Sequence, residues 1–196
     1  MDAARLKDAF TRWAAAMDKA APELNELDSR LGDGDLGVTL QKCAHNVLAA
    51  LPGAPDCVQD ILKSTSQACA DASGSSFGTL LASGLLASGK WLDERSLGRA
   101  ALPELLSHTV RRLSARGGAS LGDKTMLDSL QAIAQALSQA RPQDDLAAVA
   151  RNAAAKAIED FRDKPNRIGR ARMFAEKSIG MDDPGMVAVL RMAESL

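Results

Sequence analysis

Three carboxylates lie close together in the sequence, at one joint, a term used here for a connection between two predicted helices. Asp28, Asp33 and Asp35 occur in the stretch LDSRLGDGDLG, where Gly32 and Gly34 accompany them. The glycines allow the chain to reverse direction and to bring the carboxylates together. Clustered carboxylates repel one another unless a cation neutralises them, and oxygen ligands alone select a hard cation such as Mg²⁺ or Ca²⁺. The spacing therefore makes these three residues candidate metal ligands.

The joint does not match an EF-hand loop. Counted from Asp33, the position that needs a bidentate Glu is Ala44. Mg²⁺ usually keeps some water ligands and shares other positions with phosphate oxygens, which favours a nucleotide as co-ligand. The alternative is that GDGD is only a turn followed by a helix cap, because acids are favoured at a helix N-terminus. The residues alone leave both interpretations open.

A second joint is rich in glycine and reads RGGASLGDKTM at positions 116–126. Gly117 and Gly122 have the spacing of a P-loop, but Asp123 precedes the Lys124-Thr125 pair and no strand is expected before it. The stretch is therefore not a Walker motif. Its amides at a helix start could bind an anion or face an adenine ring, while an ordinary loop capped by Asp123 or Thr125 is equally consistent.

Two further stretches contain residue types that suit phosphate binding. Three arginines, Arg170 among them, and a lysine lie between positions 164 and 183, where they either clamp phosphate or lie in solvent. ADASGSSFGT, from position 70, has a Gly- and Ser-rich turn that includes Ser73. His45 and His108 are isolated within helices, so no Ser-His-Asp or Cys-His set can be assembled. The chain has no evident general base or nucleophile.

The elements that position these joints are predicted to be helices. Of the 196 residues, 46% are hydrophobic and only 3% are aromatic, which favours helix-on-helix packing over sheets. Leu6, Phe10, Trp13 and Met17 recur on one face of the first helix. No stretch alternates as a strand does. The periodicity predicts one all-α domain, residues 1–196, with eight up-and-down helices near residues 2–20, 36–51, 56–72, 75–91, 101–116, 125–140, 143–163 and 184–195.

Prolines and one long connection complete this prediction. Pro22 is expected to close the first helix or to open a short further turn before the acidic joint. Pro103 and Pro142 suit first-turn positions just inside later helices. The segment from 164 to 183 lacks clean periodicity, although RARMFAEKS could hold a turn or two of helix. Long ordered loops in compact domains are usually functional.

Charge and cysteine content argue against several classes of protein. The formal net charge is −1, so no broad basic surface predicts a nucleic-acid partner. The three cysteines, without CxxC spacing, are interpreted as free thiols in a reducing compartment. The N-terminal stretch is amphipathic and charged, and no run approaches ~18 apolar residues, so no membrane partner is expected. The sequence predicts a soluble cytoplasmic protein.

The four joints resemble one known family, in order and in spacing. LDSRLGDGDLG, ASGSSFGT, GDKTMLD and GRARMFAEKSIGMDDPG are similar to motifs of the nucleotide-binding L subunit of dihydroxyacetone kinases, which is also the C-terminal half of the single-chain, ATP-dependent enzymes. The resemblance covers essentially the whole chain. It implies an eight-helix antiparallel up-and-down barrel with the nucleotide site at one end.

The resemblance also implies roles for particular residues. Asp28, Asp33 and Asp35 would chelate two Mg²⁺ ions that grip the phosphates of ADP or ATP. No catalytic residue is assigned to this chain, because in the family the ketose is held by a histidine of a separate K-type subunit. The nucleotide contacts implied by the resemblance are Leu36, Gly37, Val38, Thr39, Ala72, Ser73, Gly117, Met126, Arg170, Asp183, Pro184 and Gly185.

The implied function is a phosphotransferase subunit of the glycerone kinase type, in glycerol metabolism, that passes a phosphoryl group to dihydroxyacetone or a related ketose. In one donor route bound ADP is rephosphorylated by a phosphohistidine carrier protein, which a free-standing chain favours. In the other, ATP exchanges at each turnover. Leu36 stands where many relatives have His, and Ala70-Asp71 where many have Gly-Gly. These departures leave open a non-catalytic nucleotide-binding module, and the sequence leaves open a homodimer.

Overall fold

The computed structural model describes residues 2–72 and 74–196, and within them the chain is all-helical. The described part has four short 3-10 helices, η1 (Leu51–Gly53), η2 (Leu92–Glu94), η3 (Arg99–Ala101) and η4 (Arg170–Ser178). Its α-helices are α1 (Ala3–Leu31), α2 (Leu36–Ala50), α3 (Val58–Ala72), α4 (Ser76–Trp91), α5 (Leu102–Gly117), α6 (Met126–Ser138), α7 (Leu146–Arg162) and α8 (Pro184–Glu194). The predicted eight α-helices are confirmed.

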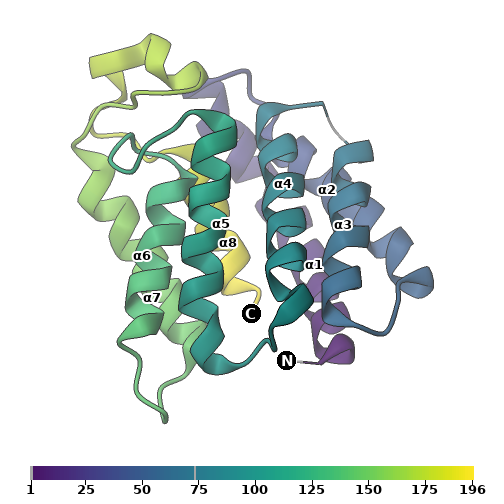
Figure 1. The fold of residues 1–196 in the computed structure, drawn as a ribbon. Coiled ribbons are helices and arrows are strands. Elements are labelled where there is room, and N and C mark those ends of the chain that lie inside the picture. Colours follow the sequence, from purple (N-terminus) through teal and green to yellow (C-terminus); the bar gives the residue numbers. More distant parts are fainter. Residues whose placement is uncertain (1, 73) are drawn as a thin grey trace.

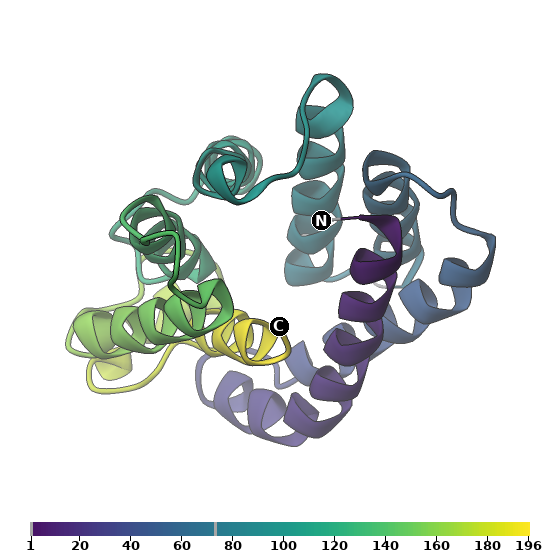
Figure 2. The same cartoon turned by 90° about the horizontal axis from the view of Figure 1, so that it is seen from below.

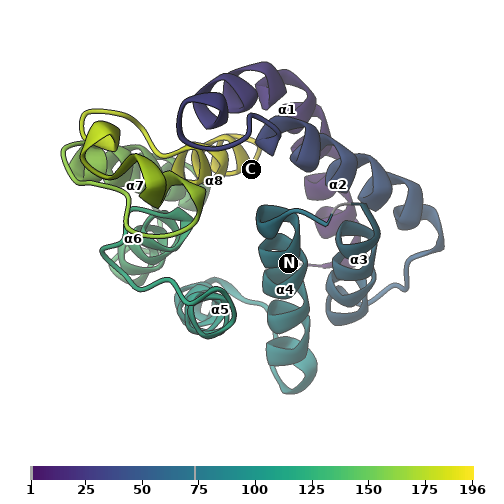
Figure 3. The ribbon, with the colours of Figure 1, turned by 90° about the horizontal axis from the view of Figure 1, so that it is seen from above.

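The helices form a ring in which each packs against the next one along the chain (Figure 1). Figure 2 and Figure 3 show the ring from its two ends, with α8 returning to lie beside α1. The contact between α8 and α1, called the seam below, closes the ring. Arg191 of α8 stabilises it, because its guanidinium donates to both carboxylate oxygens of Glu23 in α1, at 2.7 and 2.8 Å. The predicted antiparallel up-and-down barrel is therefore confirmed.

The up-and-down order decides where the four candidate joints lie. A connection that follows an odd-numbered helix emerges at one end of the ring, and one that follows an even-numbered helix emerges at the other. All four joints follow odd-numbered helices: they link α1 to α2, α3 to α4, α5 to α6 and α7 to α8. They gather at the same end, the upper one in Figure 1. Joints about a hundred residues apart in sequence thus become neighbours in one region.

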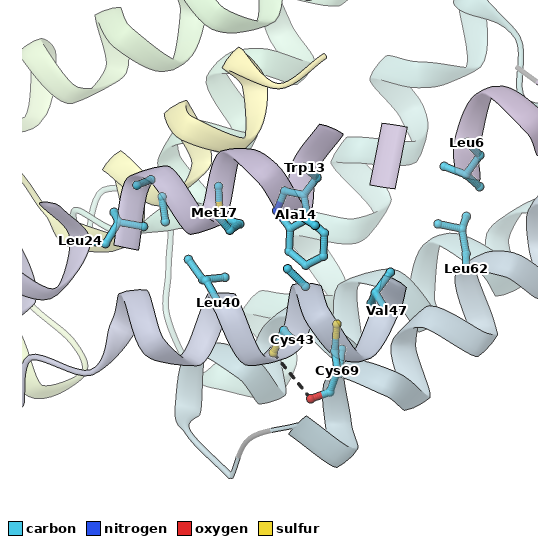
Figure 4. Packing of buried hydrophobic residues seen from close by; sticks show 14 of the residues in the cluster. Leu6, Trp13, Ala14, Met17, Leu24, Leu40, Cys43, Val47, Leu62 and Cys69 are labelled. Atoms are coloured by element: carbon cyan, nitrogen blue, oxygen red, sulfur yellow. Dashed lines mark hydrogen bonds between the residues drawn. The ribbon is translucent and has the colours of Figure 1, made fainter. Parts of the chain in front are cut away.

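The first helix shows how the core is built. Leu6, Trp13 and Met17 are buried on one face, as their spacing predicts, and the partly buried Phe10 meets Trp13 edge-on with ring centroids 6.1 Å apart. Figure 4 shows this face lying against Leu40, Cys43 and Val47 of α2 and Leu62 and Cys69 of α3. Small residues let α1 and α2 approach closely. A Cβ added at Gly37 would lie only 2.7 Å from the Cα of Ala21.

Three boundaries differ from the prediction. Pro22 does not close the first helix, because α1 continues through it to Leu31. The third helix begins at Val58 rather than near Asp56, whose carboxylate instead accepts from Lys7 at 3.0 Å. The seventh helix begins at Leu146 after an Asp145 cap, so Pro142 lies in the preceding turn and not in the first turn of the helix. Pro103 is in the first turn of α5, as predicted.

Candidate nucleotide and metal site

The acidic joint brings its three carboxylates together. Asp28 lies in the last turn of α1, and the chain then reverses through Gly34, whose φ is +77°, to present Asp33 and Asp35. One oxygen from each of the three carboxylates lies within 4.8 Å of the others. Asp28 also fixes the turn itself, because its Oδ2 accepts from the backbone N–H of Asp35 at 3.0 Å and of Leu36 at 3.3 Å.

The electrostatics of this cluster suit a hard cation. Partial burial raises the pKa of the Asp35 carboxyl, and the neighbouring Asp33 and Asp28 raise it further. A divalent cation would relieve this repulsion, and an all-oxygen donor set fits Mg²⁺ or Ca²⁺. Arg170, from the 3-10 helix η4, forms an ion pair with the carboxylate of Asp33. The donor set therefore fits a hard divalent cation, and a basic side chain from the long loop already lies beside it.

The start of α2 is held by a residue that sequence reasoning missed. The side-chain oxygen of Asn25 accepts from the backbone N–H of Gly37 at 2.8 Å and of Val38 at 3.2 Å. Asn25 lies three residues before Asp28 on α1. Gly37 is buried, whereas Val38 is 40% exposed. An Asn inside a helical stretch gives no signal of this role, because its partners lie on the next helix.

The other predicted contacts on this helix and the next have different exposures. Leu36 and Thr39 are buried at the start of α2. Ala72 is the last residue of α3, and Ser73 lies outside the described residues. Asp71, the carboxylate that departs from the family pattern, is exposed and accepts from the side chain of Gln67 at 2.8 Å. The Asp71 carboxylate is therefore engaged within its own helix.

The glycine-rich joint is a tight turn that ends in a capped helix. Gly118 and Gly122 have φ angles of +73° and +98°, so the turn needs glycine at both positions. Thr125 caps α6 in a capping box with Asp128, and Asp128 also accepts from the backbone N–H of Gly122 at 2.6 Å. Thr125 is thus the cap, of the two candidates considered. Gly117 ends α5.

Lys124, in this turn, joins the two ends of the long loop. It is only 1% exposed, and its ammonium donates to the backbone carbonyls of Arg162, Lys164 and Ser178, at 3.0, 2.8 and 3.0 Å. Burial lowers the pKa of this ammonium. The backbone of Lys124 has φ +62°, which is uncommon for a residue with a side chain. One side chain therefore holds together the two ends of a loop of about twenty residues.

Asn166 and Asp183 continue this buried polar cluster. The side-chain amide of Asn166 donates to the carbonyl of Lys124 at 2.9 Å and to the carboxylate of Asp183 at 2.7 Å. Asp183 caps α8 by accepting from Met186 at 2.9 Å. Burial raises the pKa of Asp183 to about 6. Sequence reasoning missed Lys124 and Asn166, since their partners lie at least 17 residues away along the chain.

Three of the predicted nucleotide-contact residues, Met126, Asp183 and Gly185, lie together beside this buried polar cluster. A Cβ placed on Gly185 would lie 3.1 Å from the carboxylate of Asp183, 3.4 Å from the ring of Phe77 and 3.7 Å from Met126. Pro184, Met126 and Asp183 are buried. The structure thus gathers Met126, Asp183 and Gly185 at one point, and it gathers Arg170 with the acidic triad at another.

No helix in the described residues is long and apolar enough to span a membrane.

The whole chain is similar to kinase subunits and kinase domains. It is 29% identical over 193 residues to the PEP-dependent dihydroxyacetone kinase, ADP-binding subunit DhaL, of Escherichia coli K12, covering 95% of this chain and 92% of that protein. It is 33% identical over 184 residues to the L-erythrulose 1-kinase of Mycolicibacterium smegmatis, covering 89% of this chain. The chain spans 32% of the length of that kinase.

A solved structure and a family model agree with these relatives. The dihydroxyacetone kinase of Citrobacter freundii in complex with AMP-PNP and Mg²⁺ superposes with a TM-score of 0.78 at 25% identity, over 98% of this chain and 33% of that one. The model of the DAK2 domain matches residues 30–196. This chain belongs to the DAK2 domain family.

Proposed function

We propose that this chain is the nucleotide-binding subunit of a ketose kinase, a phosphotransferase of the glycerone kinase type. It binds Mg-ADP or Mg-ATP and passes a phosphoryl group to dihydroxyacetone or a related ketose held on a separate K-type subunit. The observation that carries the proposal is the triad Asp28, Asp33 and Asp35, whose oxygens lie within 4.8 Å of one another beside Arg170. Membership of the DAK2 family supports it.

The acidic triad would hold two Mg²⁺ ions against the nucleotide phosphates. Bound there, the metal would supply positive charge that neutralises the developing charge between the β- and γ-phosphates. Arg170 would exchange its ion pair with Asp33 for a phosphate oxygen, since a guanidinium binds either anion in the same bidentate way. The proposed nucleotide contacts are Leu36, Gly37, Val38, Thr39, Ala72, Ser73, Gly117, Met126, Arg170, Asp183, Pro184 and Gly185.

The acceptor and the donor route are proposed from the likeness to ADP-binding subunits. The DhaL subunit of Escherichia coli matches this chain over 92% of its length. This chain covers only 32% of the M. smegmatis kinase and 33% of the C. freundii kinase, so each of those kinases has a large further part. Residues 1–196 correspond to a single L-type domain, so the ketose would be held by a K-type subunit or domain outside them. The likeness to subunits of PEP-dependent kinases favours ADP that stays bound and is rephosphorylated by a phosphohistidine carrier protein. The free cysteines Cys43, Cys57 and Cys69 are consistent with a cytoplasmic protein.

Two alternatives have a specific basis. An ATP-exchanging subunit would use the same site with weaker nucleotide retention. A non-catalytic nucleotide-binding module is favoured by Leu36, which lacks the hydrogen-bond donor to phosphate that a His would supply, and by Asp71, which adds a carboxylate. Because Asp71 is engaged by Gln67 within α3, it gives this module little support.

Thermal unfolding with and without Mg-ADP tests the proposal. The wild-type chain should be stabilised by about 3 kcal/mol at a nucleotide concentration of about 100 times Kd. Asp33→Ala should abolish this stabilisation and leave the helical circular dichroism unchanged. Asp160→Ala, which removes an exposed acid from α7, is the matched control and should keep it. Retained stabilisation in Asp33→Ala would rule out the triad as the nucleotide anchor.

Native mass spectrometry separates the donor routes. An ADP-plus-two-Mg²⁺ mass that survives extensive dialysis supports the carrier-linked route, and a bare chain that binds added Mg-ATP supports exchange. A chain that binds nucleotide but never supports phosphoryl transfer with a K-type subunit would be the non-catalytic module.

A further inference from the structure

A basic groove lies on the surface between α4 and α5, which run side by side in Figure 1. We define it by its cations, Lys90, Arg95, Arg111, Arg112 and Arg116. Its volume is about 880 Å³, and among the described side chains Glu104 is the one carboxylate that lines it. The whole chain has a net charge of −1, so this concentration of cations is local.

The cations of the basic groove differ from most others on this protein in their partners. Among the side chains that the structure describes, Arg111, Arg112 and Arg116 form no ion pair with a carboxylate, and Arg95 lies over the ring of Trp91 at 4.8 Å. Elsewhere, ion pairs with carboxylates occupy the side chains of Arg12, Arg30, Arg141, Arg162, Arg170 and Arg191. The groove therefore retains uncompensated positive charge.

The charge in the basic groove acts on a neighbouring side chain. Burial lowers the pKa of His108, which also lines the groove, and the nearby Arg111, Arg112 and Arg95 lower it further. A positive potential from several arginines is thus felt at one point on the groove wall.

Apolar side chains line the groove together with these cations. They are Leu86, Ala87, Trp91 and Ala115; Leu86 is 38% exposed, whereas Ala87 and Trp91 are buried. The lining residues of α5 run from Glu104 to Arg116, which at the rise of an α-helix corresponds to about 18 Å. A single small anion is gripped by donors that converge on one point. Cations spread along a groove that also exposes apolar side chains instead suit an elongated ligand that has both a charged and an apolar side.

We infer that the basic groove between α4 and α5 is a docking surface for an acidic amphipathic helix of a partner protein. The apolar stripe of that helix would lie on Leu86 and Ala115, and its carboxylates would pair with Arg111, Arg112 and Arg116. A groove of about 18 Å accommodates three turns of helix. The inference does not depend on the proposed function, because none of these residues is in the acidic triad or among the proposed nucleotide contacts; Arg116 directly precedes the contact Gly117.

Fluorescence anisotropy with a designed probe tests the inference. The probe is a labelled sixteen-residue peptide with Glu on one helical face and Leu on the other, added to the full chain without Mg²⁺ at low salt. Arg112→Glu combined with Arg116→Glu should weaken binding at least ten-fold. Lys19→Glu combined with Arg151→Glu makes the same change in net charge at exposed positions on α1 and α7 and should alter binding less than two-fold.

Further binding measurements distinguish an amphipathic helix from other ligands. A scrambled peptide of the same composition should bind at least ten-fold more weakly, and Asp33→Ala should bind the probe like the wild-type chain. The inference is overturned if the wild-type chain binds no probe, if the control pair weakens binding as much as the groove pair, or if the scrambled peptide binds equally. Tripolyphosphate or duplex DNA that binds as tightly, and with the same dependence on Arg112 and Arg116, would also overturn it by showing a general polyanion site.

Discussion

Replacing the buried Asp183 by Asn should change how stability depends on pH. Burial raises the pKa of this carboxyl from an unfolded value of 3.8 to about 6. Between those two values the folded chain keeps a proton that the unfolded chain has lost. The contribution of Asp183 to stability is therefore greatest below the unfolded pKa and falls as pH rises through the folded pKa. Asp183→Asn cannot titrate, so it lacks this decline.

The magnitude follows from the two pKa values. Their difference corresponds to about 3 kcal/mol in total, at about 1.4 kcal/mol for each pH unit. Between about pH 4.5 and about pH 7.5, linkage gives a decline of about 2 kcal/mol for the wild-type chain relative to Asp183→Asn. Any constant cost of the substitution, such as a weaker cap on α8, is the same at each pH and cancels from this difference.

Urea unfolding followed by circular dichroism measures the effect. The free energy of unfolding is determined at several pH values for the wild-type chain and for Asp183→Asn, and the difference between them is plotted against pH. Asp145→Asn is the control, because Asp145 also caps a helix but is exposed. Wild-type and Asp183→Asn curves that run parallel across this range would refute the argument that burial holds a proton on Asp183.

Other substitutions test the packing of the loops and helices. Lys124→Met should destabilise the fold by about 3 kcal/mol in urea unfolding, because three backbone carbonyls, that of the buried Ser178 among them, lose a charged donor, and it should speed proteolysis between residues 163 and 183. A cost under about 1 kcal/mol would contradict the role of this lysine. Gly37→Ala should cost about 1–3 kcal/mol, measured in the same way, because its Cβ would meet Ala21. Glu23→Gln should cost at most about 1 kcal/mol by thermal unfolding, since its partly exposed pair with Arg191 is screened by solvent.

The fold could be predicted from the sequence because helical periodicity is a local signal. The face formed by Leu6, Trp13 and Met17 is buried as its spacing requires, and Pro103 occupies a first turn. Pro22 misled the prediction, since a proline usually interrupts a helix. Here Ala20, Ala21 and Leu24 around it are buried, so tertiary packing outweighs the lost backbone hydrogen bond.

The candidate site could be predicted only where its residues lie close in sequence. Asp28, Asp33 and Asp35 occupy one joint, and the structure brings their oxygens together. Lys124 and Asn166 were missed because their partners lie 38 to 54 residues away for Lys124 and 17 and 42 residues away for Asn166. A buried lysine is rare, so no residue pattern would have placed this one inside the molecule.

The seam between α8 and α1 has a consequence for how the chain reaches its native state. The seven consecutive pairs from α1–α2 to α7–α8 are adjacent along the chain, so those hairpins can form early with little loss of loop entropy. The seam joins segments more than 150 residues apart, as the bond from Arg12 to the carbonyl of Ser195 shows. We therefore expect the ring to assemble hairpin by hairpin and to close at this seam last, with an open, C-shaped intermediate whose two edge helices are α1 and α8.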